Sequence, residues 1–322
     1  MATQGDFFPD VPLPEWLPDE LLFSLLSRFH RISGNLEHTE TCQQLFGPRR
    51  KRCAHDLPHW IEDLSHRARG VLGTADYIIH KGTLLPVYLP FLSSGEAHEC
   101  YEALKGAGLG RHRSRLCRQI PSQATVQPLK ACPQCMERDR ENLGVGYWHL
   151  SHQLPGVLVC VEHSQPLWHS SLNMDNGRDV RWHLPQTNAL NTPAWTPDSL
   201  GPEAMALLKK IATLAMAVFR QPKGAQFKAE ALSAAYLARL GERKPDSNPW
   251  NVEVLLAHAQ DMQEHFACLD PLREFEEVYG SAHGAASAIG DAMSRENGRS
   301  IPWNHLLVMT WLSFGPHQKG PS

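Results

Sequence analysis

Two short segments with the spacing of metal ligands constrain the fold of this chain more than any other feature. Cys132-Pro133-Gln134-Cys135 and Cys160-Val161-Glu162-His163 are separated by 24 residues. Thiolates and imidazoles are ligands that zinc prefers, and a structural zinc site takes four of them in a tetrahedron. A gap of two residues lets one tight turn direct two side chains at one ion, and Pro133 fixes a backbone angle in the first turn. The sequence therefore predicts a structural Zn²⁺ site formed by Cys132, Cys135, Cys160 and His163.

Other interpretations of these residues explain less. We expect a chain without a secretory signal, whose thiols stay reduced, and a redox Cys-x2-Cys pair would leave Cys160 and His163 unexplained. A catalytic zinc keeps its fourth position open for water, whereas four ligands are supplied here. The nucleobase-deaminase pattern would begin at His38-Thr39-Glu40, but Ala131 stands where that pattern has proline. His149 and His152 are alternative candidates for one of the four ligands.

Length and charge narrow the class of protein. A chain of 322 residues has room for two or three domains of usual size. Its formal net charge of −3 excludes a protein that coats nucleic acid by bulk charge, but does not exclude local basic patches. Lys209 and Lys210 interrupt the apolar run that comes closest to spanning a bilayer. We therefore expect a soluble cytoplasmic protein that does not bind membranes.

Helical periodicity marks the start of the chain. Apolar residues recur at helical spacing from Leu21 to Ile32, Asp19 stands where a helix cap is expected, and Ser33-Gly34 ends the pattern. A second helix is predicted over 39–46. A helix, a glycine turn and a short helix are compatible with a helix-turn-helix motif, and equally with a plain helical hairpin. Further helices are predicted over 57–70 and 96–106, and a buried crossing segment, broken by prolines, over 84–92.

Basic residues gather in two places. The first run directly follows the second predicted helix, and the second lies shortly before the first cysteine pair. Arginine binds phosphate in a bidentate manner, so both are candidate DNA contacts, although a solvated loop or a charged helix face explains them as well. The candidate DNA-binding residues are Arg49, Arg50, Lys51, Arg52, Arg111, Arg113, Arg115 and Arg118.

The predicted fold class is mainly α. We expect an N-terminal helical, helix-turn-helix-like domain over 1–125, a zinc-ribbon module over 126–170, a linker over 171–202 and an all-helical C-terminal domain over 203–322. In the ribbon, 156–159 should be a strand leading to Cys160, and Tyr147, Trp148 and His149 should pack its small core. C-terminal helices are predicted over 203–220, 226–241, 251–267, 270–279, 281–295 and 303–313.

Several of these segments resemble one family. Pro18-Asp19-Glu20-Leu21-Leu22-Phe23-Ser24-Leu25-Leu26-Ser27-Arg28 is similar to the opening helix of the TniQ/TnsD family, as is the later stretch 80–91. The zinc segment matches more closely, through both cysteine-containing turns, Tyr147-Trp148-His149 and Leu154-Pro155-Gly156. Trp303-Asn304-His305 is similar to a helix that closes a helical unit of the family. The resemblance covers about 15–170.

The resemblance implies a function. Members of the family select target sites for heteromeric bacterial transposons and do not cut DNA themselves. It implies that Cys132, Cys135, Cys160 and His163 hold a structural zinc ion. It also implies two partners, target DNA and an AAA+ ATPase transposition regulator (TnsC-like), and leaves self-association open. Some members instead dock on a CRISPR effector complex that finds DNA by guide pairing. Members that read DNA directly have a longer C-terminal region, so we expect a shorter member or a truncated chain.

Two alternatives belong to other classes. A zinc-dependent hydrolase or nuclease is disfavoured, because neither a G-x-x-x-x-G-K-[ST] phosphate loop nor an H-E-x-x-H motif is present. A protein-binding scaffold that never contacts DNA would use the apolar helices equally well. The remaining cysteines have irregular spacing, and we expect buried thiols more than a second metal site at Cys42, Cys53, His55, Cys100 and Cys117.

Overall fold

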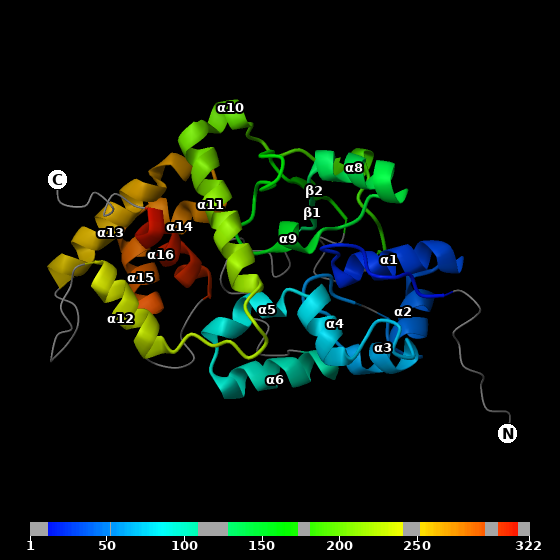
Figure 1. The fold of residues 1–322 in the computed structure, drawn as a ribbon. Helices are drawn as coiled ribbons and strands as arrows, with labels where there is room; N and C mark the ends of the chain where they lie inside the picture. The colour runs from blue at the N-terminus through cyan, green and yellow to red at the C-terminus, as the bar shows by residue number, and fades with distance from the viewer. Residues whose placement is uncertain are drawn as a thin grey trace, which may run out of the picture.

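The computed structural model describes residues 12–51, 53–108, 128–172, 181–240, 252–293 and 302–314. The protein is mainly helical, as predicted. In Figure 1 the N-terminal helices lie on one side and the C-terminal helices on the other, and the cysteine-containing module packs between them with the long helix α11. Among the described residues, no helix is both long and apolar enough to cross a membrane.

Seven short helices lie in the described residues of the N-terminal part. The predicted helices are present, although the one predicted over 57–70 is shorter, and α4 was not predicted. The segment 84–92 is buried, as predicted, and its prolines start two short helical turns. The elements are α1 (Leu22–Ser33), α2 (His38–Phe46), α3 (Ile61–Arg67), α4 (Ala75–Gly82), α5 (Leu85–Tyr88), η1 (Leu89–Phe91) and α6 (Ser94–Lys105).

The helix α1 supplies the centre of the N-terminal core. Leu22, Leu25, Leu26 and Phe29 are all fully buried, as their i, i+3, i+4 spacing predicts, whereas Ile32 at the helix end is 51% exposed. Asp19 does not cap this helix, which is a correction. Leu21 occupies the cap position without a side-chain bond, and Asp19 has φ +54° and contacts the cysteine-containing module instead.

The central module is a small sheet with two helices. Strands β1 (Lys130–Ala131), β2 (Trp168–Ser170) and β3 (Leu190–Asn191) pair antiparallel in that order. Lys130 pairs with His169, and Ser170 pairs with Leu190. The helices are α8 (Pro133–Leu143) and α9 (Leu150–Gln153). The strand predicted over 156–159 is wrong, because Val159 forms only an isolated bridge with Pro166.

Part of the predicted linker is packed. After the described residues resume at 181, the Trp182 ring stacks on Phe23 of α1 with centroids 5.1 Å apart. Its backbone and indole nitrogens both bond to His38 at the start of α2. The chain then forms η2 (Thr187–Ala189), β3 and α10 (Pro197–Leu200). Residues 181–191 therefore join the sheet to α1 and α2. The domain boundaries themselves stay a prediction.

The C-terminal part is helical, as predicted. Its core contains Phe266, Phe275, Trp303 and Trp311, each at most 2% exposed. The helix α11 packs on α5 of the N-terminal part and on α16, so it joins the two sides. The elements are α11 (Pro202–Phe219), α12 (Ala229–Arg239), α13 (Val252–Phe266), η3 (Ala267–Leu269), η4 (Arg273–Phe275), α14 (Glu276–Tyr279), α15 (Ala282–Met293) and α16 (Pro302–Phe314).

Candidate metal centre

The first pair of candidate ligands lies at the start of α8. Cys132 is the residue before the helix, Pro133 is its first residue, and Cys135 lies in its first turn. Proline suits this position because its fixed φ is helical and its missing N–H would have no partner there. The backbone N–H of Met136 donates to the carbonyl of Cys132 at 3.0 Å. A helix start, rather than an isolated turn, therefore directs the two thiols to one side.

The second pair lies on a closed loop. The N–H of Cys160 donates to the carbonyl of Gln165, and the N–H of Ser164 donates to the carbonyl of Cys160, both at 2.8 Å. Ser164 has φ +54°, in the left-handed region, where the chain reverses. The two backbone bonds hold the loop so that His163 returns to face Cys160.

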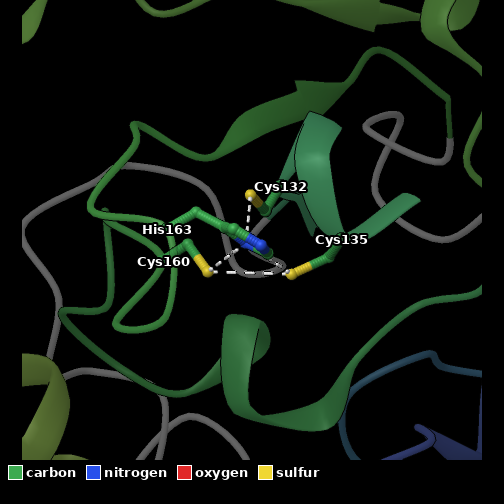
Figure 2. A group of neighbouring side chains, drawn as sticks. All are labelled: Cys132, Cys135, Cys160 and His163. Atoms are coloured by element: carbon green, nitrogen blue, oxygen red, sulfur yellow. Dashed lines mark hydrogen bonds between the residues drawn. The ribbon is translucent and has the colours of Figure 1, made fainter. Parts of the chain in front are cut away.

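The four side chains converge on one point (Figure 2). Nδ1 of His163 lies 3.5 Å from Sγ of Cys132, 3.3 Å from Sγ of Cys135 and 3.6 Å from Sγ of Cys160. The sulfurs of Cys135 and Cys160 are 3.7 Å apart. A tetrahedral zinc ion with Zn–S bonds of about 2.3 Å separates its sulfur ligands by roughly 3.7 Å. Donor set and spacing therefore both fit a zinc ion.

The negative charge of three thiolates in this cluster also favours a bound cation. The pKa of the Cys135 thiol is raised by hydrogen bonds between this thiol and those of Cys132 and Cys160, and also by burial. Three thiolates facing one another in a buried place repel, so all three cannot ionise without a positive ion among them. A bound metal reverses this preference, because it binds the deprotonated form of each thiol.

Two histidines that could substitute as ligands have other partners. Nε2 of His149 lies 2.7 Å from a carboxylate oxygen of Asp139, and Nδ1 lies 3.6 Å from Asp19. Burial alone would lower the pKa of His149, but the bonds with Asp139 and Asp19 raise it to about 9. His152 points Nε2 at Sγ of Cys135, 3.9 Å away, and lies outside the four-residue cluster.

A buried lysine braces the module. Lys130 on β1 is 6% exposed, and its Nζ donates to the carbonyls of Val157 at 2.6 Å and Leu154 at 3.3 Å. Burial lowers the pKa of Lys130 to about 8. The amide of Gln153 bonds both backbone groups of Lys130 at 2.8 Å. Sequence reasoning missed this residue, because a lone lysine beside a cysteine gives no local sign that it is buried.

The aromatic segment between the two cysteine pairs joins the module to α1. The carbonyl of Trp148 accepts from the N–H of Leu21 at 3.0 Å, and its own N–H donates to Oγ of Ser24. The hydroxyl of Tyr147 donates to the carbonyl of Pro18 at 2.9 Å. These aromatics are buried, as expected for residues that pack the core of the ribbon, but they also join the ribbon to α1. Trp148 is fully buried between the module and the first helix.

The first basic run lies between α2 and α3. Arg49 and Lys51 are exposed, whereas the guanidinium of Arg50 lies 4.1 Å from the centre of the Trp60 ring and 3.8 Å from Asp63. Arg67 of α3 is a further basic residue in this region that sequence reasoning did not single out. Its guanidinium lies beside Gly47 at the end of α2. Arg52, Arg111, Arg113, Arg115 and Arg118 lie outside the described residues.

The other cysteines behave as buried thiols where they are described. Cys42, Cys53 and Cys100 are buried, and burial raises the pKa of Cys42 to about 12. Within the described ranges, the cluster at Cys132 is the only group with the geometry of a metal site. Cys117 lies outside those ranges.

A cleft opens beside the metal cluster. Its volume is about 370 Å³, and four parts of the chain line it: the turn at Pro18-Asp19, the start of α8, the segment from Tyr147 to Glu162, and the end of α11. Cys135 and Cys160 are among the residues that line it.

Sequence comparison finds similarities that span the helical N-terminal part and the Cys3His cluster. Residues 12–167, just under half of the chain, match the family model described as TniQ. The chain is similar to the Transposon Tn7 transposition protein TnsD of Escherichia coli, with 24% identity over 209 residues. The alignment covers 64% of this chain and 39% of that protein.

Proposed function

We propose that this protein selects target sites for DNA transposition, by binding target DNA and recruiting an AAA+ ATPase transposition regulator. The observation that carries the proposal is the span of the TniQ match. Residues 12–167 contain α1, the basic run and all four candidate ligands. The similarity to TnsD, whose name places it in transposition, supports the same function.

The metal in this proposal is a structural zinc ion held by Cys132, Cys135, Cys160 and His163. When bound, zinc supplies folding energy to a module whose sheet has strands of only two or three residues. These four side chains would fill the coordination sphere of a tetrahedral ion and would leave no position for an activated water. We therefore propose that the protein is not an enzyme.

The DNA contact in this proposal is the surface between α2 and α3. Arg49 and Lys51 are exposed, and no ion pair joins them to an acidic side chain in the described part of the chain, so their charge is available for phosphate. The charge of Arg50 is partly neutralised by Asp63, and its guanidinium is held against the Trp60 ring. Arg50 would therefore contact phosphate from one fixed position. Contacts of this kind set the position of DNA and do not read its sequence.

Fluorescence anisotropy with labelled duplex DNA tests this surface. The double change Arg49→Glu and Lys51→Glu should weaken DNA binding. It should also make the slope of log K against log salt concentration shallower, by the amount expected for the loss of about two phosphate contacts. Arg239→Glu, an exposed arginine at the end of α12, is the matched control and should change neither quantity beyond the general effect of charge. Equal loss in both variants would contradict the assignment.

A pull-down separates the partners. Purified AAA+ ATPase regulator should be retained by the immobilised chain, and retention should require zinc. If a CRISPR effector complex is retained while DNA binding by the chain alone is absent, the targeting route is guide pairing and direct DNA contact is excluded.

A further inference from the structure

A second cleft, which shares no lining residue with the one beside the metal cluster, lies where α1 and α8 end (Figure 1). Its volume is about 250 Å³. Arg31 in the last turn of α1 and Arg140 in the last turn of α8 line it, together with the loop 144–146 and the segment 184–186. A cleft of this size is smaller than most sites for whole small molecules, so it suits a single chemical group.

The charge of this lining is positive. Neither an aspartate nor a glutamate is among the described residues that line the cleft. Arg31 is exposed, and no ion pair joins it to another residue in the described part of the chain. Arg140 pairs with Glu137 at 3.2 Å, but both side chains are exposed enough to make this pair weak. The negative end of a helix favours a basic residue in its last turn, which explains each arginine alone but not their meeting at one cleft.

The loop 144–146 adds two backbone donors to the cleft. Among the described residues, no acceptor bonds the N–H of Val145 or the N–H of Gly146, and Gly146 is buried. The absence of a side chain at Gly146 also leaves room for a guanidinium, since Nε of Arg140 lies 3.8 Å from the position that a Cβ would take there. Two guanidiniums and two unbonded N–H groups at one cleft favour an anion with oxygen acceptors.

The buried Trp148 fixes two walls of this cleft. Its backbone N–H donates to Oγ of Ser24 in α1 at 3.0 Å. Its indole N–H donates to the carbonyl of His183 at 2.8 Å, directly before the wall 184–186. Walls that are already in position reduce the loss of conformational freedom on binding.

The cleft is also connected to the proposed DNA surface. Trp182, two residues before the wall 184–186, bonds to His38 at the start of α2. The helix α2 has 9 residues and is therefore about 13 Å long, and the run with Arg49 and Lys51 follows it. One turn of a DNA duplex is about 34 Å long, so one duplex segment can contact both places.

We propose that this cleft binds one backbone phosphate of target DNA, with Arg31 and Arg140 as its two cationic contacts and the N–H groups of Val145 and Gly146 as further donors. Arginine suits this ligand because each guanidinium can donate two parallel hydrogen bonds to phosphate oxygens. The inference rests on the proposed binding of target DNA, and it adds a site at the ends of α1 and α8 to the surface between α2 and α3. Free phosphate and the carboxylate of a partner protein share part of this chemistry, so the experiment includes both.

Fluorescence anisotropy of the zinc-loaded full chain with a labelled duplex of about 30 base pairs, roughly three turns, tests the proposal. Because both arginines hold one phosphate, Arg31→Gln and Arg140→Gln should each weaken binding about 10-fold, and the double variant only about 10- to 20-fold. In all three variants the slope of log K against log salt concentration should become shallower by about 0.9, the value for one phosphate. Arg239→Gln, an exposed arginine in the last turn of α12, is the matched control and should change the affinity less than about twofold.

Three results would overturn the shared phosphate site. The first is additive loss, about 100-fold in the double variant with a slope shallower by about 1.8, which is the behaviour of independent surface charges. The second is unchanged DNA affinity with weaker retention of the AAA+ regulator, which would assign the cleft to a protein carboxylate. The third is calorimetric binding of inorganic phosphate more tightly than about 1 mM that Arg31→Gln abolishes, which would make this a site for free phosphate.

The outcomes also separate this inference from the proposed function. Thermal unfolding and zinc content check that each variant keeps the fold of the unaltered chain. If the unaltered chain does not bind duplex DNA, the proposed DNA contact and this inference are both overturned. If the double change at Arg49 and Lys51 weakens binding while Arg31→Gln does not, only the cleft is overturned.

Discussion

The central module meets its two neighbours by different physical means. Its contact with α1 is polar and directional: backbone bonds join Leu21 to Trp148 and Asp19 to Leu150, and His149 lies between two carboxylates. Its contact with the C-terminal helices includes one bond from Lys209 to Ser164 but is mainly apolar, and Gly156 packs directly against the ring of Trp303. The stability of the polar contact therefore depends on the protonation state of its side chains. The stability of the apolar contact depends on the volume of the groups that pack there.

The largest effect should come from removing the metal, because both contacts need a folded module. Cys132→Ser should reduce bound zinc from about one ion per chain to well below half and unfold the module, since zinc binding to small domains contributes on the order of 10 kcal/mol. Elemental analysis and thermal unfolding measure the two effects. Cys268→Ser, at a half-buried thiol outside the cluster, should keep its zinc. Full zinc content in the Cys132 variant would show that the ligands are wrong.

The next effect should come from the buried ion pair at the polar contact. Glu20 is 1% exposed, and its carboxylate accepts two bonds from Arg28 and one from the N–H of Leu17. Glu20→Gln leaves the guanidinium without its counter-charge and should cost about 3 kcal/mol of unfolding free energy. Glu137→Gln removes the exposed pair with Arg140 and should cost less than about 1 kcal/mol. Chemical denaturation compares them, and similar losses would mean that burial is unimportant here.

A pH dependence should mark the polar contact and not the apolar one. Because the pKa of His149 is raised from 6.5 to about 9, its contribution is fully present below pH 6.5 and is lost as pH rises through about 9. The loss should be on the order of 3 kcal/mol. Denaturation at pH 6.5 and 9.5 measures it, and His149→Gln should remove this part of the pH dependence. Subtracting the variant cancels the pH dependence of zinc binding, and an unchanged difference would contradict the assignment.

The smallest difference between paired variants should separate volume from backbone strain at the apolar contact. Gly156 and Gly144 both have φ +72°, but a Cβ at Gly156 would overlap the Trp303 ring, whereas a Cβ at Gly144 meets nothing within 4 Å. Gly144→Ala should cost about 1 kcal/mol from backbone strain alone. Gly156→Ala should cost about 1–3 kcal/mol more, from overpacking. Thermal unfolding measures both, and equal losses would show that the Trp303 contact yields easily.

Local patterns in the sequence were sufficient where one segment carries all the information. The spacing within each cysteine-containing turn is short, so it predicts which side chains can share an ion, and the structure brings those four together. The spacing of Leu22, Leu25, Leu26 and Phe29 predicts α1 because a helix places them on one face. One prediction from a local pattern was wrong: the short apolar run 156–159 before Cys160 does not form a strand.

Only the tertiary structure decided which distant segments meet. Asp19 has the residue type and position of a helix cap, yet it binds the central module 132 residues further on at Ser151. The stretch 171–202 has the composition of a linker, yet Trp182 stacks on Phe23 and Leu190 extends the sheet. Periodicity and spacing are properties of neighbouring residues, so the sequence determined most of the helices and the four candidate ligands. Partners far apart in the chain are chosen by packing and charge, which appear only when the chain is folded.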